Sequence, residues 1–247
     1  MNEIEAIKKK IISYDRKKWW GDDVDARFHL IFKIKNIKNE KVLDVGGGIG
    51  IVSAELNKTN LRVNADSNFN DLIICKKNVD SKIQGVCCFM LNLPFRDNVF
   101  NMTISASSLQ YAKNSDLKEK KFKENTDIKK YPSVQKSLHE IYRTLENEGK
   151  LILVTPNNSF YQSYMLTYHE LKTAIKEYFP NFSLKFYNTF PKLSSKYRKM
   201  NLANSIPKIM IKIKNPKKVL SSLIKDDNGI AKNSVSFYLE AIKKSVE

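Results

Sequence analysis

The residues with the clearest chemical purpose lie between positions 41 and 50, where a short apolar strand carrying Asp44 runs into a glycine-rich turn. Four of the eight glycines in the chain fall within five positions there, and a helical pattern over 51–58 follows. Because glycine has no Cβ, a bound molecule can approach the backbone of such a turn closely. A strand, a glycine turn and a helix N-terminus in this order predict a nucleotide pocket of a doubly wound α/β fold.

The spacing of these glycines restricts the kind of ligand. A dinucleotide fingerprint needs Gly-x-Gly-x-x-Gly, whereas the third glycine here comes one position early, and the Gly-Lys-Ser/Thr of a phosphate loop is absent. A carboxylate at the strand end, Asp44, would repel a pyrophosphate and suit a cationic ligand. A purely structural strand-to-helix turn is the alternative interpretation of these residues taken alone.

Three further segments follow the glycine turn. Residues 61–66 indicate a second strand ending in Asp66, whose two carboxylate oxygens can accept from a pair of hydroxyls. Residues 91–105 combine Leu-Pro-Phe, a polar turn and an apolar strand, and residues 140–157 combine a helix, Arg-x-Leu and a strand ending in Thr-Pro-Asn. Ligands of open α/β sheets lie beyond the carboxyl ends of strands, so the candidate lining residues after the 102–105 strand are Ser107, Ser108, Gln110 and Tyr111.

This combination resembles the class I S-adenosylmethionine (SAM)-dependent methyltransferases, in particular the broad type 11 group that serves small-molecule acceptors. The glycine turn corresponds to their acid-x-Gly-x-Gly-x-Gly motif, and the resemblance covers roughly residues 40–190. It implies SAM as the cofactor. It also implies a Rossmann-like, doubly wound α/β sheet of seven mostly parallel strands. The antiparallel last strand, 234–243, would lie between the fifth strand and the sixth, 182–190.

The resemblance assigns a cofactor site, with one departure. Asp66 stands where the family binds both ribose hydroxyls, but Phe89 stands where an Asp often accepts from the adenine amino group. Either the Phe89 ring packs on the adenine, or main-chain groups near Met90 and Leu91 bind it, or Asn92 moves in. The cofactor-binding residues implied are Asp44, Gly46, Gly47, Gly48, Gly50, Asp66, Ser67, Phe89, Met90, Leu91 and Ser107.

The first 38 residues are expected to form a helical extension ahead of a methyltransferase domain over 39–247. Apolar spacing predicts helices over 3–14 and 24–35, with both tryptophans of the chain between them. In the family, a helix ahead of the glycine turn often covers the cofactor and touches substrate. The residues we expect at the substrate mouth are Trp19, Trp20, Arg27, His29 and Tyr111; core packing of the tryptophans and a surface histidine are the alternative.

Methyl transfer from a sulfonium is an in-line displacement, and positioning of the reacting atoms can supply much of the rate enhancement. A base is needed only if the acceptor is a hydroxyl or a protonated amine. Tyr111 and His29 are the candidate bases. His139 and His169 lie on a predicted helix and a predicted capping turn, which makes them poorer candidates.

Two insertions interrupt the family pattern. The charged segment 113–136 is expected to be an exposed loop, with a substrate flap as the alternative. The late segment 191–233 contains a basic and apolar run over 206–224, which fits a substrate cover that touches a membrane surface as well as a helical cap packed on the sheet edge. Between them, Thr167 and Glu170 resemble a capping box at the start of a helix.

Composition restricts the partners. The formal charge of +17 would suit a nucleic-acid partner, but only six of the 43 basic residues are arginines. We therefore favour a general bias in amino-acid composition as the origin of the charge. The motifs of amino-methylating nucleic-acid enzymes are absent. The three cysteines show no metal or redox spacing, no apolar run approaches the length of a membrane span, and the N-terminus lacks the core of a signal peptide, so no metal and a cytoplasmic location are expected.

The sequence therefore predicts SAM-dependent methyl transfer to a small-molecule acceptor such as a lipid, quinone or glycan precursor. An RNA or protein methyltransferase that uses the basic surface is one alternative. A non-catalytic module with the same fold is another, because Phe89 and Glu148 depart from the family pattern. Peripheral membrane contact and the oligomeric state stay open.

Overall fold

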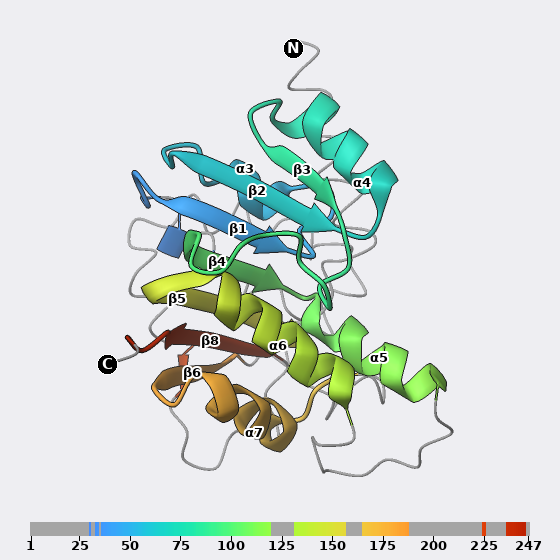
Figure 1. Ribbon diagram of the computed structural model, residues 1–247, viewed down its shortest axis with the longest axis vertical. Helices are drawn as coiled ribbons and strands as arrows, with labels where there is room; N and C mark the ends of the chain where they lie inside the picture. The colour runs from blue at the N-terminus through green and yellow to red at the C-terminus, as the bar shows by residue number, and fades with distance from the viewer. Residues whose placement is uncertain are drawn as a thin grey trace, which may run out of the picture.

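The protein is built on one mixed β-sheet (Figure 1). The computed structural model describes residues 30, 33–34, 36–119, 131–156, 165–187, 224–225 and 236–245. The strand order is β3-β2-β1-β4-β5-β8-β6-β7. The strands are β1 (Lys41–Val45), β2 (Leu61–Asp66), β3 (Gln84–Cys87), β4 (Phe100–Ala106), β5 (Leu145–Pro156), β6 (Phe182–Tyr187), β7 (Ile224–Lys225) and β8 (Ser236–Ile242).

Strands β1 to β5 run parallel, and β8 inserts antiparallel between β5 and β6. The predicted seven-stranded sheet with an antiparallel last strand in that position is confirmed. The additional strand is β7, a two-residue edge strand that pairs with β6 and lies near the end of the predicted insertion 191–233. The chain reverses its direction of travel across the sheet between β1 and β4, so the parallel strands leave a crevice at their carboxyl ends.

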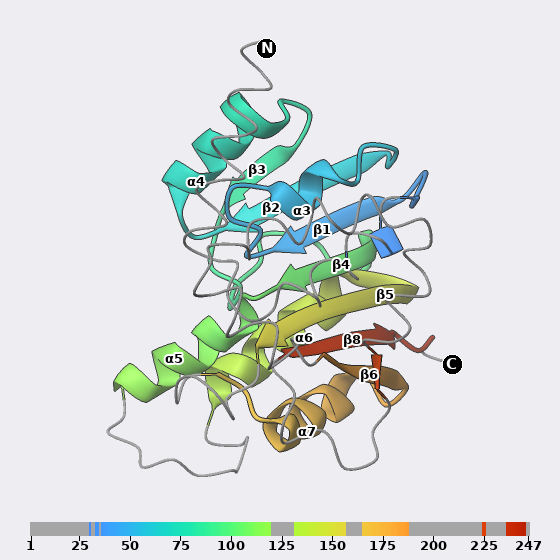
Figure 2. The same cartoon turned by 180° about the vertical axis from the view of Figure 1, so that it is seen from behind.

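Helices cover both faces of the sheet. In Figure 1, α6 and α7 lie in front of it, and the reverse view of Figure 2 shows α3 on the opposite face. The helix expected over 51–58 ends early, because α3 gives way to a turn after Ala54. The helical elements are α3 (Ile51–Ala54), α4 (Phe69–Ile74), the π-helical turn η1 (Cys75–Val79), α5 (Leu109–Glu119), α6 (Pro132–Thr144) and α7 (Tyr168–Tyr178).

Alternation along the central strands divides the core into two parts. Leu43 and Val45 of β1 point toward α5, α6 and α7, whereas Val42 points to the other face, where Leu30 and Ile34 pack. Successive side chains of a strand face opposite sides, so a strand covered on both faces is apolar throughout. This explains why Leu151–Val154 of β5 is wholly buried. Helical backbone at positions 30, 33 and 34 agrees with the end of the helix predicted over 24–35.

The expectation of an exposed loop over 113–136 is wrong at both ends. Lys113 and Asp116 belong to α5 and are buried, and α6 begins at Pro132. The Asp116 carboxylate accepts from the hydroxyl of Ser133 at 2.6 Å and from its main-chain N–H. Charge density predicted solvent exposure, but these charges have partners supplied by distant elements. Residues 120–130, 1–29 and, apart from β7, 191–233 lie outside the described residues, so the predictions made there stay untested.

The predicted capping box at the start of α7 is confirmed. The Thr167 hydroxyl accepts from the Glu170 N–H at 3.2 Å, and the Glu170 carboxylate accepts from the Thr167 N–H at 2.7 Å. We expect Thr167→Ala to lower the free energy of unfolding by about 1 kcal/mol, because it strips the cap from a helix N-terminus. Urea unfolding would measure this. Thr167→Ser keeps the hydroxyl, so its free energy of unfolding should lie within a few tenths of a kcal/mol of the wild-type value. An equal loss of stability in both variants would contradict a role for the hydroxyl.

Candidate functional site

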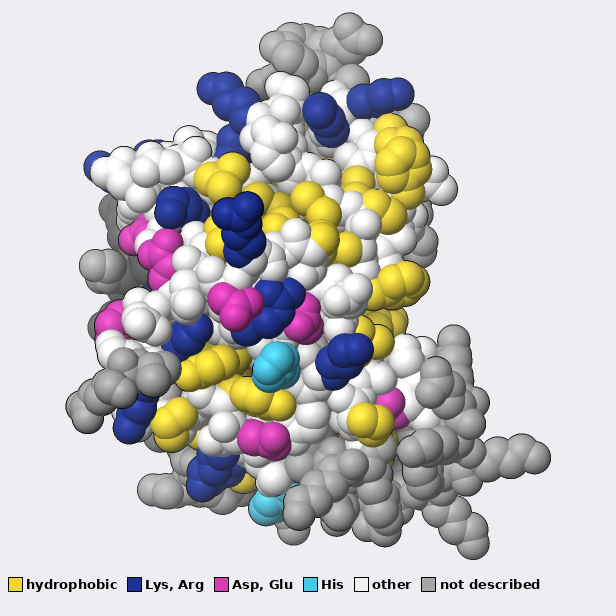
Figure 3. All heavy atoms as spheres, viewed as in Figure 1, with side chains coloured by type: hydrophobic (Ala, Val, Ile, Leu, Met, Phe, Trp, Pro, Cys, Tyr) yellow, Lys and Arg dark blue, Asp and Glu magenta, His cyan; other side chains and the backbone are white. Residues whose placement is uncertain are grey.

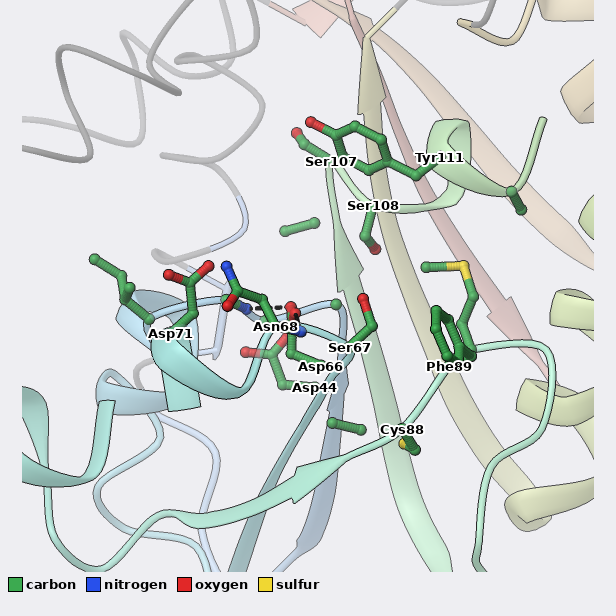
Figure 4. Close-up of a pocket in the computed structure, with 18 of the residues that line it drawn as sticks. Asp44, Asp66, Ser67, Asn68, Asp71, Cys88, Phe89, Ser107, Ser108 and Tyr111 are labelled. Atoms are coloured by element: carbon green, nitrogen blue, oxygen red, sulfur yellow. Dashed lines mark hydrogen bonds between the residues drawn. The ribbon is translucent and has the colours of Figure 1, made fainter. Parts of the chain in front are cut away.

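A cavity of about 360 Å³ opens at the carboxyl ends of the parallel strands (Figure 4). The turn after β1 and the end of β2 form its floor. The loop after β3 forms one wall, and the end of β4 with the start of α5 forms the other. The cavity therefore lies where open α/β sheets bind their ligands. The predicted cofactor residues that line it are Asp44, Gly46, Gly47, Gly48, Asp66, Ser67, Phe89, Met90, Leu91 and Ser107.

Tight packing excludes side chains at Gly46 and Gly47 of the glycine turn. A Cβ on Gly47 would lie 2.5 Å from the Asn64 carboxamide oxygen and 2.7 Å from the Asp44 carboxyl carbon. The Asn64 amide donates to the Gly48 carbonyl at 2.8 Å, and the Gly46 N–H donates to the Ala65 carbonyl at 2.7 Å. The turn is thus fixed against β2, and its upper surface is left as bare backbone facing the cavity.

Asp66 is held in a fixed orientation at the end of β2. One carboxylate oxygen accepts from the Gly48 N–H and the other from the Asn68 N–H, each at 2.8 Å. Each carboxylate oxygen has two lone pairs, so each can still accept from a ligand hydroxyl. Such a carboxylate is ready to bind a vicinal diol, because little side-chain entropy is lost when the ligand arrives.

Asp44 lies deeper than the other acids of the site. Its side chain is 1% exposed, borders the cavity from beneath the turn and accepts from the Ser53 hydroxyl at 2.7 Å. Gly50, also predicted to bind cofactor, does not border the cavity. It caps α3 with a φ of 78°, and a Cβ there would collide with the sulfur of Cys75 in η1. The requirement for glycine at position 50 is therefore packing and backbone conformation.

The wall after β3 is apolar. Its residues are Cys88, Phe89, Met90 and Leu91, and the Met90 methyl group reaches to 3.7 Å from where a Cβ of Gly46 would be. Phe89 is 70% exposed at the cavity mouth. Burial raises the pKa of the Cys88 thiol to about 11, so it stays protonated at neutral pH and is a poor nucleophile.

Arg143 of α6 anchors the segment that follows this wall. Its guanidinium donates to the carbonyls of Leu93 and Phe95, both at 2.6 Å, and forms two 2.7 Å bonds with Glu140. Glu140 in turn accepts from the Leu93 N–H at 2.7 Å. The hydrogen bonds from Arg143 hold the pKa of the Glu140 carboxyl below its usual range. The Leu-Pro-Phe and Arg-x-Leu features of the sequence are therefore two halves of one contact.

The opposite wall is rich in hydroxyls. Ser107 has a φ of +56°, and the Gln110 side chain donates to its carbonyl at 2.8 Å. Ser108 shares a 2.6 Å hydrogen bond with Ser105 and donates to the Val45 carbonyl at 2.8 Å. Gln110, expected to line the cavity, supports this turn from behind instead. Ser107, Ser108, Tyr111 and Ser115 face the cavity.

Sequence reasoning missed several lining residues. Asn68 and Asp71 begin α4, where Asn68 caps the helix by accepting from the Asn70 N–H. The succession of a strand-end acid, an Asn cap and an acid in the first helical turn was a usable signal. Ile49, Ile51 and Cys88 also border the cavity. The substrate-mouth predictions for Trp19, Trp20, Arg27 and His29 fall outside the described residues. His139 and His169 do not line the cavity.

The described residues show neither a membrane-spanning helix nor a cluster of metal ligands. No helix among them is long and apolar enough to cross a membrane. In the same part of the chain, no three His, Cys, Asp or Glu side chains gather into a group that could hold a metal ion.

Comparisons with known proteins agree with this geometry. Residues 43–153 match a family model described as a methyltransferase domain. A curated protein of Methanocaldococcus jannaschii, named as uncharacterized, is 30% identical over 128 residues, which are 52% of this chain and 46% of that protein. The chain therefore matches about half the length of this curated relative.

Solved structures share the fold at low sequence identity. One is a SAM-dependent methyltransferase from Thermotoga maritima described as a possible histamine N-methyltransferase, with a TM-score of 0.56 and 12% identity, over 98% of this chain and all of the other. Another is a Haloferax volcanii putative methyltransferase in complex with the activator Trm112, with a TM-score of 0.58 and 12% identity, over 99% of each chain.

A third is phosphoethanolamine N-methyltransferase 2 of Haemonchus contortus in complex with SAM, with a TM-score of 0.56 and 17% identity, over 88% of this chain and 52% of that one. These likenesses concern the fold, whereas the family model concerns the sequence that forms the cavity. The residues that line the cavity all fall within the matched range. Residues 43–153 of the chain are therefore similar in sequence to a methyltransferase domain, and the chain has the fold of the SAM-dependent methyltransferases.

Proposed function

We propose that this protein transfers the methyl group of SAM to a small-molecule acceptor such as a lipid, quinone or glycan precursor. The observation that carries the proposal is the Asp66 carboxylate, oriented by the N–H groups of Gly48 and Asn68 at the floor of the cavity. The bare glycine backbone beside it allows close approach of a ligand. When bound, SAM supplies a methyl group activated by its sulfonium.

The described residues fit that cofactor. Asp66 would take the two ribose hydroxyls, and the carboxylates of Asp44 and Asp71 make the floor of the cavity favourable to a cation. The hydroxyl-rich wall of Ser107, Ser108 and Tyr111 would then border the methyl group and the incoming acceptor. Tyr111 is 39% exposed at the mouth, where an acceptor would enter. The chain's contribution to rate is to hold the reacting atoms in line and to exclude water.

A small-molecule acceptor is favoured over nucleic acid by the distribution of charge. None of the described residues that line the cavity is Lys, Arg or His. On the face shown in Figure 3, Lys and Arg side chains are scattered, with Asp and Glu among them, and form no continuous basic track. Nucleic-acid binding proteins concentrate such charge on one face or stripe.

Calorimetric titration with SAM is the first test. We expect the wild type to bind, and Asp66→Ala to weaken the dissociation constant about 30-fold, because charge-assisted hydrogen bonds to the ribose are lost. Gly48→Ala should also weaken binding, because it puts a methyl group on the cavity floor at a φ of +53°. A screen of lipid, quinone and sugar acceptors would follow with the wild type.

Thermal unfolding of each variant separates a lost ligand contact from a lost fold. Asp66→Asn is the matched control, because it keeps the shape and one oxygen acceptor and should bind with intermediate affinity. Absence of SAM binding by folded wild-type protein would contradict the proposal and favour a non-catalytic module. If the protein methylates RNA in preference to small molecules, and its RNA binding weakens steeply with salt, then the acceptor is RNA and the small-molecule part of the proposal is wrong.

A further inference from the structure

The end of the cavity next to β3 differs chemically from the rest, because its wall is apolar. Asp66 lies between the two walls, where it would hold the ribose of the cofactor. The hydroxyl-rich wall on one side would border the methyl group and the acceptor. The apolar wall of Cys88 to Leu91 on the other side suits a planar heteroaromatic ring. Figure 4 shows Cys88 and Phe89 on the loop after β3, across the cavity from Asn68 and Asp71.

This wall offers no side chain that accepts a hydrogen bond strongly. Residues 83–95 contain no charged side chain, although Lys82 and Arg96 flank them. Asn92 is exposed and is not among the lining residues. Asp97 and Glu140, whose carboxylates lie near the Leu93–Phe95 segment that follows this wall, are bound to Arg143. An exocyclic amino group directed at this wall would meet neither a carboxylate nor a carboxamide side chain of the wall.

Phe89 provides a different kind of contact. Its ring is 70% exposed, although apolar residues surround it in sequence, and it borders the cavity at the mouth. The Phe89 carbonyl accepts from the Asn92 N–H at 3.0 Å, which holds the turn that presents the ring. An aromatic face binds any base by stacking, and stacking is tolerant of the substituents on the base edge.

We propose that this site holds the base of its cofactor by stacking on Phe89 and does not read the 6-amino group. The inference rests on the proposed function, because it takes SAM as the ligand. The 6-position of the base would lie toward the open mouth beside Phe89. The site should therefore accept cofactors in which the 6-amino group is removed or alkylated, provided that ribose and sulfur are unchanged.

Calorimetric titration with S-adenosylhomocysteine and its 6-deamino analogue, which carries hydrogen in place of the amino group, tests this. The wild type should bind the two with dissociation constants within about threefold of each other. Phe89→Ala should weaken both in parallel by about tenfold or more, because stacking is lost. Phe69→Ala is the matched control: Phe69 is 62% exposed at the start of α4 and is not among the cavity-lining residues, so its loss should leave both affinities unchanged.

Phe89→Asp supplies the complementary result. A carboxylate at this position should accept from the 6-amino group, so the variant should prefer S-adenosylhomocysteine over the deamino analogue by about tenfold. Equal binding of the two ligands by this variant would place the base elsewhere and overturn the inference. So would a tenfold preference for the 6-amino ligand in the wild type. In both cases binding persists and the proposed function stands, whereas failure of folded wild type to bind SAM and S-adenosylhomocysteine overturns both.

Discussion

Arg143→Leu is expected to lower the free energy of unfolding by about 3 kcal/mol. The guanidinium bonds two main-chain carbonyls, Glu140 and Asp97, and its removal leaves the mostly buried Glu140 carboxylate without its cation. In a chain of this size, that loss corresponds to a fall in the unfolding midpoint of roughly 6–12 °C. Differential scanning calorimetry would measure it. The same variant should weaken SAM binding, because Arg143 anchors the segment that continues from the cavity wall.

Arg143→Lys is the informative control. Lysine keeps the charge but cannot form the planar, forked contacts to Leu93, Phe95 and Glu140 at once, so most of the destabilisation should remain. Full retention of stability by the lysine variant would mean that charge alone matters and would refute the geometric account. Arg96→Leu removes a nearby exposed arginine and should change the unfolding midpoint little.

The Glu140–Arg143 contact also predicts a dependence on pH. Because hydrogen bonds from Arg143 hold the folded-state pKa of Glu140 below its usual value of about 4.5, Glu140 contributes stability above that value. This contribution is lost as the pH falls through the folded-state pKa. The difference in stability between wild type and Glu140→Gln should be largest near neutral pH and should shrink in acid. A constant difference down to the acid transition would contradict the assignment.

Lys113→Met is expected to cost about 3–5 kcal/mol, the largest effect of a single substitution that we predict. The Lys113 ammonium lies 2.9 Å from both carboxylate oxygens of Glu170 and from the Met165 carbonyl, and it lies 4.7 Å from the centre of the Tyr131 ring. The two side chains are 2% and 3% exposed. Methionine fills a similar volume. The loss of stability therefore measures the cost of leaving the Glu170 carboxylate buried without its cation. Urea unfolding gives the magnitude.

A double-mutant cycle separates this penalty from packing. Glu170→Gln should also destabilise, whereas the double variant Lys113→Met, Glu170→Gln should be clearly more stable than the sum of the single losses predicts, because no buried charge remains. Additive losses would mean that the two groups do not interact. Thr167→Ala provides the reference for Glu170's capping role, since it removes the cap without touching Lys113.

Short-range patterns of residue type and spacing predicted most of the candidate site. The glycine turn, the strand-end acid and the capping box each combine residue types and short spacings that only a few backbone conformations satisfy. For that reason the sequence by itself placed Asp66 and the turn residues Gly46 to Gly48 where the cavity lies, and the family resemblance gave the position of the last strand.

Tertiary structure decided the features that depend on contacts between distant residues. Lys113 looked like part of a solvated charged loop, yet Glu170, 57 positions away, makes it a buried ion pair. Gly50 looked like a cofactor residue, yet its empty Cβ position is directed at Cys75. Arg143 and Leu93 were read as separate motifs until α6 brought them together. Spacing along the chain determines local backbone conformation. Burial and side-chain pairing depend instead on which distant elements the fold brings together, and the residues that determine this are spread over the whole chain.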